Sequence, residues 1–177
     1  MVAIDESSDD ESLRDLGLLT VRSSKLEAEL RDAFCALVGS KYAVVIAGGQ
    51  AASWLIDQCQ ALVRANLEMS VAHKAAMTAA LEECREANRQ RNSLIHGVKY
   101  GGWPSGRVFT ARSRKGTFEE TVESWTAETI RAAVSCISAA RFALHEAIGD
   151  SVSHEVRMMM YALHEETRAR NRSIDRS

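Results

Sequence analysis

The chain has 177 residues, of which 46% are hydrophobic and 26% are charged, and its formal net charge is −2. This length fits one ordinary domain with a sizeable core, or a domain with an accessory helix, and excludes a large multidomain enzyme. No stretch reaches the roughly 18 consecutive apolar residues of a membrane-spanning helix, and the N-terminus is acidic where a signal peptide would be basic, so we expect a cytoplasmic protein without membrane contacts.

The composition favours helices over strands. The chain has one proline and 6% aromatic residues, with abundant Ala, Leu, Glu and Arg, which is typical of long helices and not of a β-sandwich or barrel. Residues 1–12 hold five acidic side chains and no basic one, and such a segment cannot bury enough apolar surface to become ordered. We therefore expect residues 1–23 to form an acidic, flexible N-terminal tail.

The elements after this tail follow from the spacing of apolar residues. A helical pattern begins at Ser24, and Gly39 ends it. Residues 42–63 are apolar on more than one side, as in a helix buried by its neighbours, and the pair Gly48-Gly49 is expected to kink this helix. The later elements are a helix over 70–97, a glycine-rich loop, a short β-hairpin over 107–112 and 117–125, a helix over 126–149 and a last helix over 152–169.

Together these elements predict an all-α fold, an antiparallel bundle of about five helices with a short β-hairpin insertion. The helical domain spans residues 24–149, and residues 150–177 form an accessory C-terminal helix with a basic tail. The four cysteines lie far apart in apolar segments and form no C-x-x-C pair, so we interpret them as free buried thiols. We expect neither a metal site nor a cofactor.

The segment most informative about chemistry is Arg89–Gly97, at the end of the helix over 70–97. Arg91 falls on the apolar stripe of that helix, and burying an unpaired guanidinium costs several kcal/mol, so its position requires an anion or a polar partner. Asn92 and His96 are four residues apart and share a helix face, where the amide can orient the imidazole. A titratable base beside a fixed cation suits chemistry on a phosphodiester.

The local charge supports a nucleic-acid partner. Residues 85–115 carry a net charge of +7, which leaves −9 for the remainder of the chain. A solvated basic face is the simpler interpretation, but aromatic residues interleave with these cations and can stack on unpaired bases while the cations follow the RNA backbone. The candidate RNA-binding residues are Arg85, Arg89, Lys99, Trp103, Arg107, Arg112, Arg114 and Lys115.

The motif Arg91-Asn92-x-x-x-His96-Gly97, on a helix of an all-α bundle, resembles the signature of the HEPN superfamily. Prokaryotic members of this superfamily include many RNA-cleaving toxins and phage-defence proteins. The run over 47–55 is similar to the helix that precedes the motif in such proteins, and the resemblance covers residues 24–149. It implies a homodimer in which two copies of the motif form one composite cleft that cleaves single-stranded RNA without a metal.

The resemblance also assigns a role to each residue of the motif. His96 would act as general base or acid toward the ribose 2′-hydroxyl and the leaving oxygen, because imidazole titrates near neutral pH. Arg91 would stabilise the charge that develops on the phosphorane, and Asn92 would orient both groups. An alternative is a non-catalytic HEPN-like module that binds RNA, a nucleotide or another protein. An antitoxin or regulatory protein is a further partner to expect.

Overall fold

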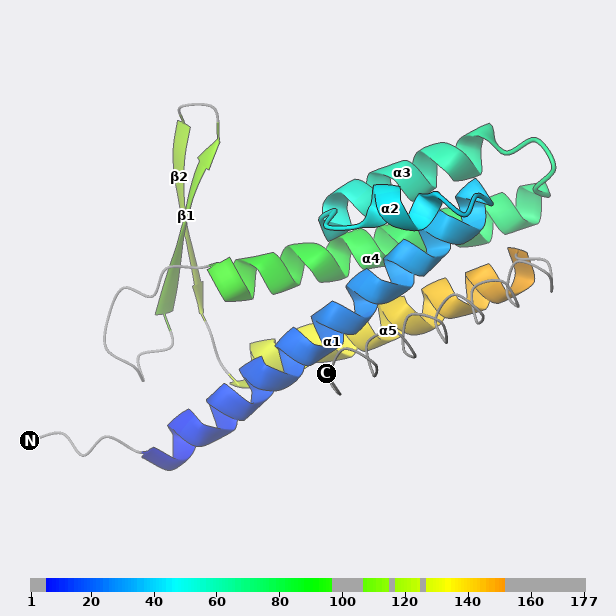
Figure 1. Cartoon of the computed structure of the whole chain (residues 1–177). Helices are drawn as coiled ribbons and strands as arrows, with labels where there is room; N and C mark the ends of the chain where they lie inside the picture. The colour runs from blue at the N-terminus through cyan, green and yellow to red at the C-terminus, as the bar shows by residue number, and fades with distance from the viewer. Residues whose placement is uncertain (1–5, 97–106, 115–116, 125–126, 152–177) are drawn as a thin grey trace, which may run out of the picture. The chain divides into compact units, whose positions relative to one another are not determined.

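The computed structural model describes the backbone of residues 6–96, 107–114, 117–124 and 127–151, and the side chains of residues 13–95 and 127–149 (Figure 1). Its elements are α1 (Glu6–Val38), α2 (Ala43–Ala47), α3 (Ala52–Ala65), α4 (Val71–His96), β1 (Arg107–Arg114), β2 (Thr117–Ser124) and α5 (Ala127–Ser151). The expectation of a mostly helical chain is confirmed. The predicted last helix over 152–169 lies outside the described residues.

The structure differs from the sequence analysis at the N-terminus. α1 is 33 residues long and begins at Glu6, so residues 6–23 are helical and do not form the expected tail. The buried face of this helix continues upstream of Ser24, since Leu19 and Leu30 are both fully buried. Ser23 is buried on the same face and donates its hydroxyl to the carbonyl oxygen of Leu19 at 2.7 Å, so it adds no unpaired polar group to the core.

A second difference concerns residues 42–63, where one kinked helix was expected. The structure has two helices, α2 and α3, separated at Gly48 and Gly49. Gly49 has a φ of +72°, in the left-handed region that most side chains avoid, and therefore the chain turns here instead of bending within one helix.

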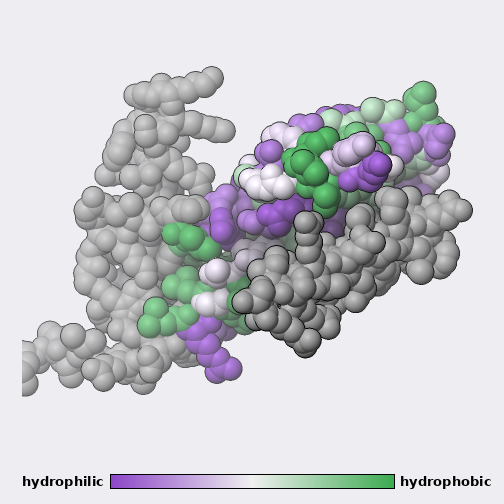
Figure 2. Space-filling model, in the orientation of Figure 1, coloured by the Kyte–Doolittle hydropathy of each residue, from purple (hydrophilic) through white to green (hydrophobic). Residues whose placement is uncertain are grey.

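α2 leaves a hydrophobic surface exposed, which we call the α2 patch. Its residues are Tyr42, Val44, Val45 and Ile46, whose side chains are 50–75% exposed. Hydrophobic residues gather over α2 in the space-filling view (Figure 2). Three large apolar side chains exposed on a five-residue helix, together with that of its N-cap residue Tyr42, are unusual for a surface and typical of an interaction site.

The turn between α3 and α4 is closed by polar side chains. The Oδ1 atom of Asn66 accepts the backbone N–H groups of Glu68 and Met69, both at 2.9 Å. The hydroxyl of Ser70 then accepts the backbone N–H of His73 at 3.2 Å. Ser70 is therefore the N-cap of α4, the helix that carries the candidate motif.

The chain divides into two compact units, and α1, α4 and α5 contribute residues to both. The first unit comprises Met1–Glu27 and Glu82–Ala143. In it, Arg131 of α5 lies 3.8 Å from the carboxylate of Asp15 of α1, and the thiol of Cys84 donates to the carbonyl oxygen of Ala140 at 3.7 Å. Its core includes Leu19, Leu26, Cys84, Ala87, Leu94, Ile130, Ala133, Ile137 and Ala140.

The second unit comprises Ala28–Leu81 and Leu144–Ser177. The rings of Phe34 and Trp54 pack in it with their centroids 5.5 Å apart. Its core includes Leu30, Ala33, Leu55, Ile56, Cys59, Val63, Met77, Leu81 and Leu144.

β1 and β2 pair antiparallel over the stretch in which the sequence analysis places a hairpin. The register sets Arg112 opposite Glu119. β1 contains three arginines and no acid, whereas β2 contains three glutamates and no base, so the two strands together carry no net charge.

Candidate functional site

The candidate motif occupies the last two turns of α4. Arg91 lies on the buried stripe of this helix, between Ala87 and Leu94. One terminal nitrogen of its half-buried guanidinium donates to the Oδ1 atom of Asn92 at 2.8 Å. Its Nε atom is buried, and no residue that the structure describes accepts a hydrogen bond from it. The polar partner expected for Arg91 is therefore supplied only in part, by Asn92.

His96 is the last residue of α4, and its side chain lies outside the described part of the chain. Because an α-helix turns about 100° per residue, positions 91 and 96 are about 140° apart around the axis of α4. Positions 92 and 96 share one face, as expected from their spacing. Asn92 therefore contacts Arg91 and shares a helix face with position 96. Positions 91 and 96 themselves lie on different sides of α4.

Two candidate RNA-binding arginines on α4 are already paired with acids. The Nε atom of Arg85 lies 3.7 Å from a carboxylate oxygen of Glu82, one turn earlier. Arg89 is exposed and forms an ion pair with Glu86. Both cations remain on the surface, but their charge is offset within the same helix.

The other candidate RNA-binding residues follow α4. Arg107, Arg112 and Arg114 are on β1, where the strand register sets Ser124, Glu119 and Thr117 opposite them. Their side chains lie outside the described residues, as do Lys99, Trp103 and Lys115 altogether.

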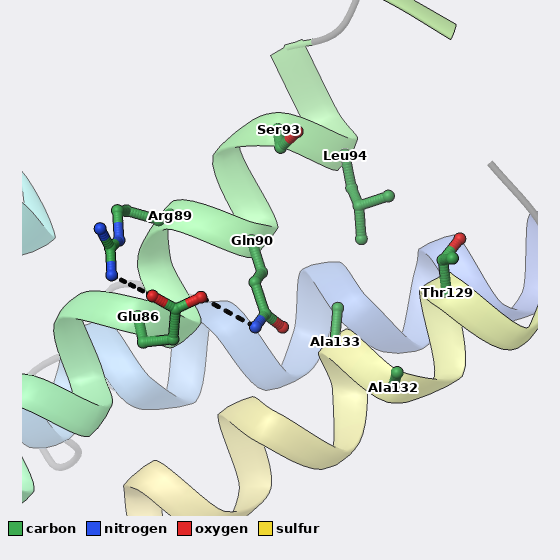
Figure 3. A pocket seen from close by; sticks show the side chains of 8 residues that line it. All are labelled: Glu86, Arg89, Gln90, Ser93, Leu94, Thr129, Ala132 and Ala133. Atoms are coloured by element: carbon green, nitrogen blue, oxygen red, sulfur yellow. Dashed lines mark hydrogen bonds and ion pairs between the residues drawn. The ribbon is translucent and has the colours of Figure 1, made fainter. Parts of the chain in front are cut away.

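A hollow between α4 and α5 was not anticipated from the sequence. It has a volume of about 550 Å³ and lies within the first unit (Figure 3). Its lining residues are Glu86, Arg89, Gln90, Ser93 and Leu94 of α4 and Thr129, Ala132 and Ala133 of α5. The only signal for it in the sequence is the run of small residues near the start of α5. Short side chains such as those of alanine leave space between this helix and the helix beside it.

The polar groups of this hollow are organised around Glu86. One carboxylate oxygen accepts the side-chain N–H of Gln90 at 3.0 Å, and the other accepts from Arg89. These hydrogen bonds, with that of Gln90 the larger cause, lower the pKa of the Glu86 carboxyl. Glu86 is therefore a carboxylate at neutral pH, and the amide nitrogen of Gln90 has to face it.

The cysteines do not form a reactive centre. All four are free thiols, and Cys59 and Cys84 are buried. Burial, with a smaller contribution from Cys35, raises the pKa of Cys59 to about 12, so this thiol is not a nucleophile at neutral pH. Among the described residues, no three His, Cys, Asp or Glu side chains lie close enough to hold a metal ion.

Across the described helices, none combines the length and the apolar character that crossing a membrane requires. Comparison of the chain with protein-family models, with curated proteins and with solved structures found no match. A functional assignment therefore depends on the residues and the geometry of this chain.

Proposed function

We propose that the chain is a metal-independent endoribonuclease of HEPN type that cleaves single-stranded RNA in the cytoplasm, as a toxin or phage-defence effector. The observation that carries this proposal is the environment of Arg91. A buried N–H donor without an acceptor costs about 1–3 kcal/mol, so the Arg91 guanidinium lacks a partner of the kind that a phosphate oxygen can supply. Asn92 holds this guanidinium, and α4 ends at His96 within two turns.

In the proposed reaction, His96 removes the proton of the ribose 2′-hydroxyl, and the 2′-oxygen attacks the adjacent phosphorus. The bond between phosphorus and the 5′-oxygen breaks, the leaving oxygen takes up a proton, and the products are a 2′,3′-cyclic phosphate and a 5′-hydroxyl. Arg91 stabilises the extra negative charge on the phosphorane.

A homodimer makes this mechanism compatible with the helix geometry. Because positions 91 and 96 lie on different sides of α4, a phosphate meets both groups more readily between two copies of the motif than on one helix. Residues of two chains would then complete one cleft, as the resemblance to HEPN proteins implies.

The test is cleavage of a fluorescently labelled single-stranded RNA in the presence of EDTA. We expect His96→Ala to lower the rate by about 100-fold or more, because general acid–base catalysis contributes that much. Arg91→Ala should have a comparable effect. His145→Ala and Arg64→Ala, which change exposed residues on α5 and α3, are the matched controls. Undiminished cleavage by His96→Ala, or cleavage only with added Mg²⁺, would contradict the proposal.

A protein-interaction module is the second candidate function, and the α2 patch favours it. The offset charges on α4 and on the β-strands weaken the attraction for RNA, whereas four exposed apolar side chains suit a regulatory protein such as an antitoxin. If this second function is correct, no RNA is cleaved. Val45→Lys then abolishes binding to a regulatory protein encoded by the neighbouring gene, and His96→Ala leaves that binding unchanged.

A further inference from the structure

Two buried polar atoms of opposite charge lie in the first unit, one on α4 and one on α1. They are the Nε atom of Arg91 and the Oδ2 atom of Asp15, and neither has a hydrogen bond within the described part of the chain. Arg131 is 3.8 Å from the carboxylate of Asp15, which is too long for a hydrogen bond. Because a buried charged group without a hydrogen bond is costly, each of the two atoms requires a partner.

Both side chains start from helix faces that build the core of this unit. Asp15 precedes the buried Leu19 by four residues, so it continues the buried face of α1, and its side chain is only 14% exposed. Arg91 follows the buried Ala87 by four residues and precedes the buried Leu94 by three. Asp15 and Arg91 are therefore directed into the interior that α1, α4 and α5 share.

The contacts between α4 and α5 fix the level of Arg91 along the unit. The thiol of Cys84 donates to the carbonyl oxygen of Ala140, whereas Leu94 and Thr129 line one hollow at the other end of the pair (Figure 3). An advance along α4 thus corresponds to a return along α5, and the two helices are antiparallel. Arg91, three residues before Leu94, is level with the turn of α5 that follows Thr129.

Asp15 reaches the same turn of α5 from α1. Arg131, which lies 3.8 Å from the carboxylate of Asp15, is the second residue after Thr129. Asp15 and Arg91 therefore stand at one level of the unit, on two different helices. The axes of packed helices are roughly 8–10 Å apart, a gap that the long side chain of an arginine can span by rotation about its χ angles.

We propose that Asp15 is the internal counter-ion of Arg91, which holds the guanidinium until a phosphate of RNA displaces it. Asn92 occupies one terminal nitrogen of Arg91, and the carboxylate of Asp15 takes the Nε edge, so both buried atoms gain a partner at once. A carboxylate and a phosphate bind a guanidinium through the same kind of paired oxygens, and they compete for it. This inference rests on the proposed function for the displacing anion, but the ion pair can be tested without RNA.

The first measurement compares two double-mutant cycles by urea denaturation of the purified full-length chain. One cycle combines Asp15→Asn with Arg91→Met, and the matched cycle combines Asp15→Asn with Arg131→Met. We expect the first pair to change the unfolding equilibrium constant by about tenfold or more relative to the product of the single effects. The second pair, in which Arg131 is 55% exposed, should deviate by about threefold at most.

The second measurement tests displacement and needs only one substitution in the core. A fluorescent single-stranded 2′-O-methyl RNA, which cannot be cleaved by its own 2′-hydroxyl, is bound at fixed salt and followed by anisotropy. We expect Asp15→Asn to bind it about tenfold more tightly than the wild type, and this gain should vanish in the Arg91→Met background. Glu83→Gln removes one exposed carboxylate of the same unit and is the control for net charge, with a change below about twofold.

The outcomes separate the counter-ion from the proposed nuclease. Coupling of Asp15 to Arg131 alone, or RNA affinity of Asp15→Asn equal to that of Glu83→Gln, would overturn the counter-ion. RNA cleavage that requires His96 would still support the nuclease in those cases. Conversely, coupling to Arg91 and tighter RNA binding by Asp15→Asn, without any cleavage of unmodified RNA, would keep the counter-ion and overturn the nuclease.

Discussion

At the scale of single residues, Gly17 has no structural requirement for glycine. It lies inside α1 and is exposed, and no atom is within 4 Å of the place where a Cβ would stand. Glycine in a helix interior is about 0.5–1 kcal/mol less favourable than alanine, because it loses more backbone entropy on folding. We therefore expect Gly17→Ala to raise the free energy of unfolding by about that amount in urea denaturation. A decrease would mean that another molecule packs closely against α1 at this point.

Cys59 gives a pH dependence of stability at the same scale. Burial raises the pKa of its thiol from 9.0 to about 12, so the unfolded chain releases this proton at a lower pH than the folded chain does. Stability is therefore complete below about pH 9 and is lost as the pH rises toward 12, by at most about 1.4 kcal/mol per pH unit. Urea denaturation between pH 8 and 10 should show a steeper decrease for the wild type than for Cys59→Ala. Parallel curves would rule out this thiol as the cause.

At the scale of elements, the N-cap of α4 is a contact whose loss is measurable. Ser70 accepts the N–H of His73, and replacing such a cap with alanine costs about 1 kcal/mol. Ser70→Ala should therefore lower the free energy of unfolding by about this amount, as measured by urea denaturation. Ser135→Ala, a change at an exposed position inside α5, is the control and should have almost no effect.

The elements also show which features the sequence could predict and why others were missed. The helices over 70–97 and 126–149 were predicted nearly to the residue, because their apolar stripes are long and glycine or capping residues mark their ends. The N-terminal helix was missed because the acidic composition of residues 1–12 outweighed the apolar positions that follow, such as Leu19. The position of Arg91 on the buried stripe was predicted, but the hollow beside Gln90 depends on how α4 and α5 pack, which local patterns do not contain.

At the scale of the whole molecule, the fold redistributes the charge that the sequence separates. The +7 run over residues 85–115 includes Arg85 and Arg89, which are paired with Glu82 and Glu86, and Arg112, which the strand register sets opposite Glu119. A linear run of charge is therefore a poor measure of the electrostatic surface.

This redistribution predicts that RNA binding depends less on salt than the charge of the run alone would give. If all eight basic residues of the run contacted phosphates, the logarithm of the association constant would fall with the logarithm of salt concentration with a slope of about −6. With Arg85, Arg89 and Arg112 offset by acids, the five others give a slope of about −3.5 per chain. Fluorescence anisotropy with a single-stranded RNA from 50 to roughly 300 mM salt measures this slope, and a value near −6 would show that the pairs open on binding.

The α2 patch determines how the folding of this protein should be followed. Dyes such as ANS fluoresce when they bind exposed apolar surface, and they usually report partially unfolded states. Tyr42, Val44, Val45 and Ile46 present such a surface in the folded chain, so the dye will fluoresce before any unfolding begins. The emission of Trp54, which packs against Phe34 in the second unit, distinguishes a folded chain with bound dye from a loosened one when it is read in a variant that has Trp103 and Trp125 replaced with phenylalanine.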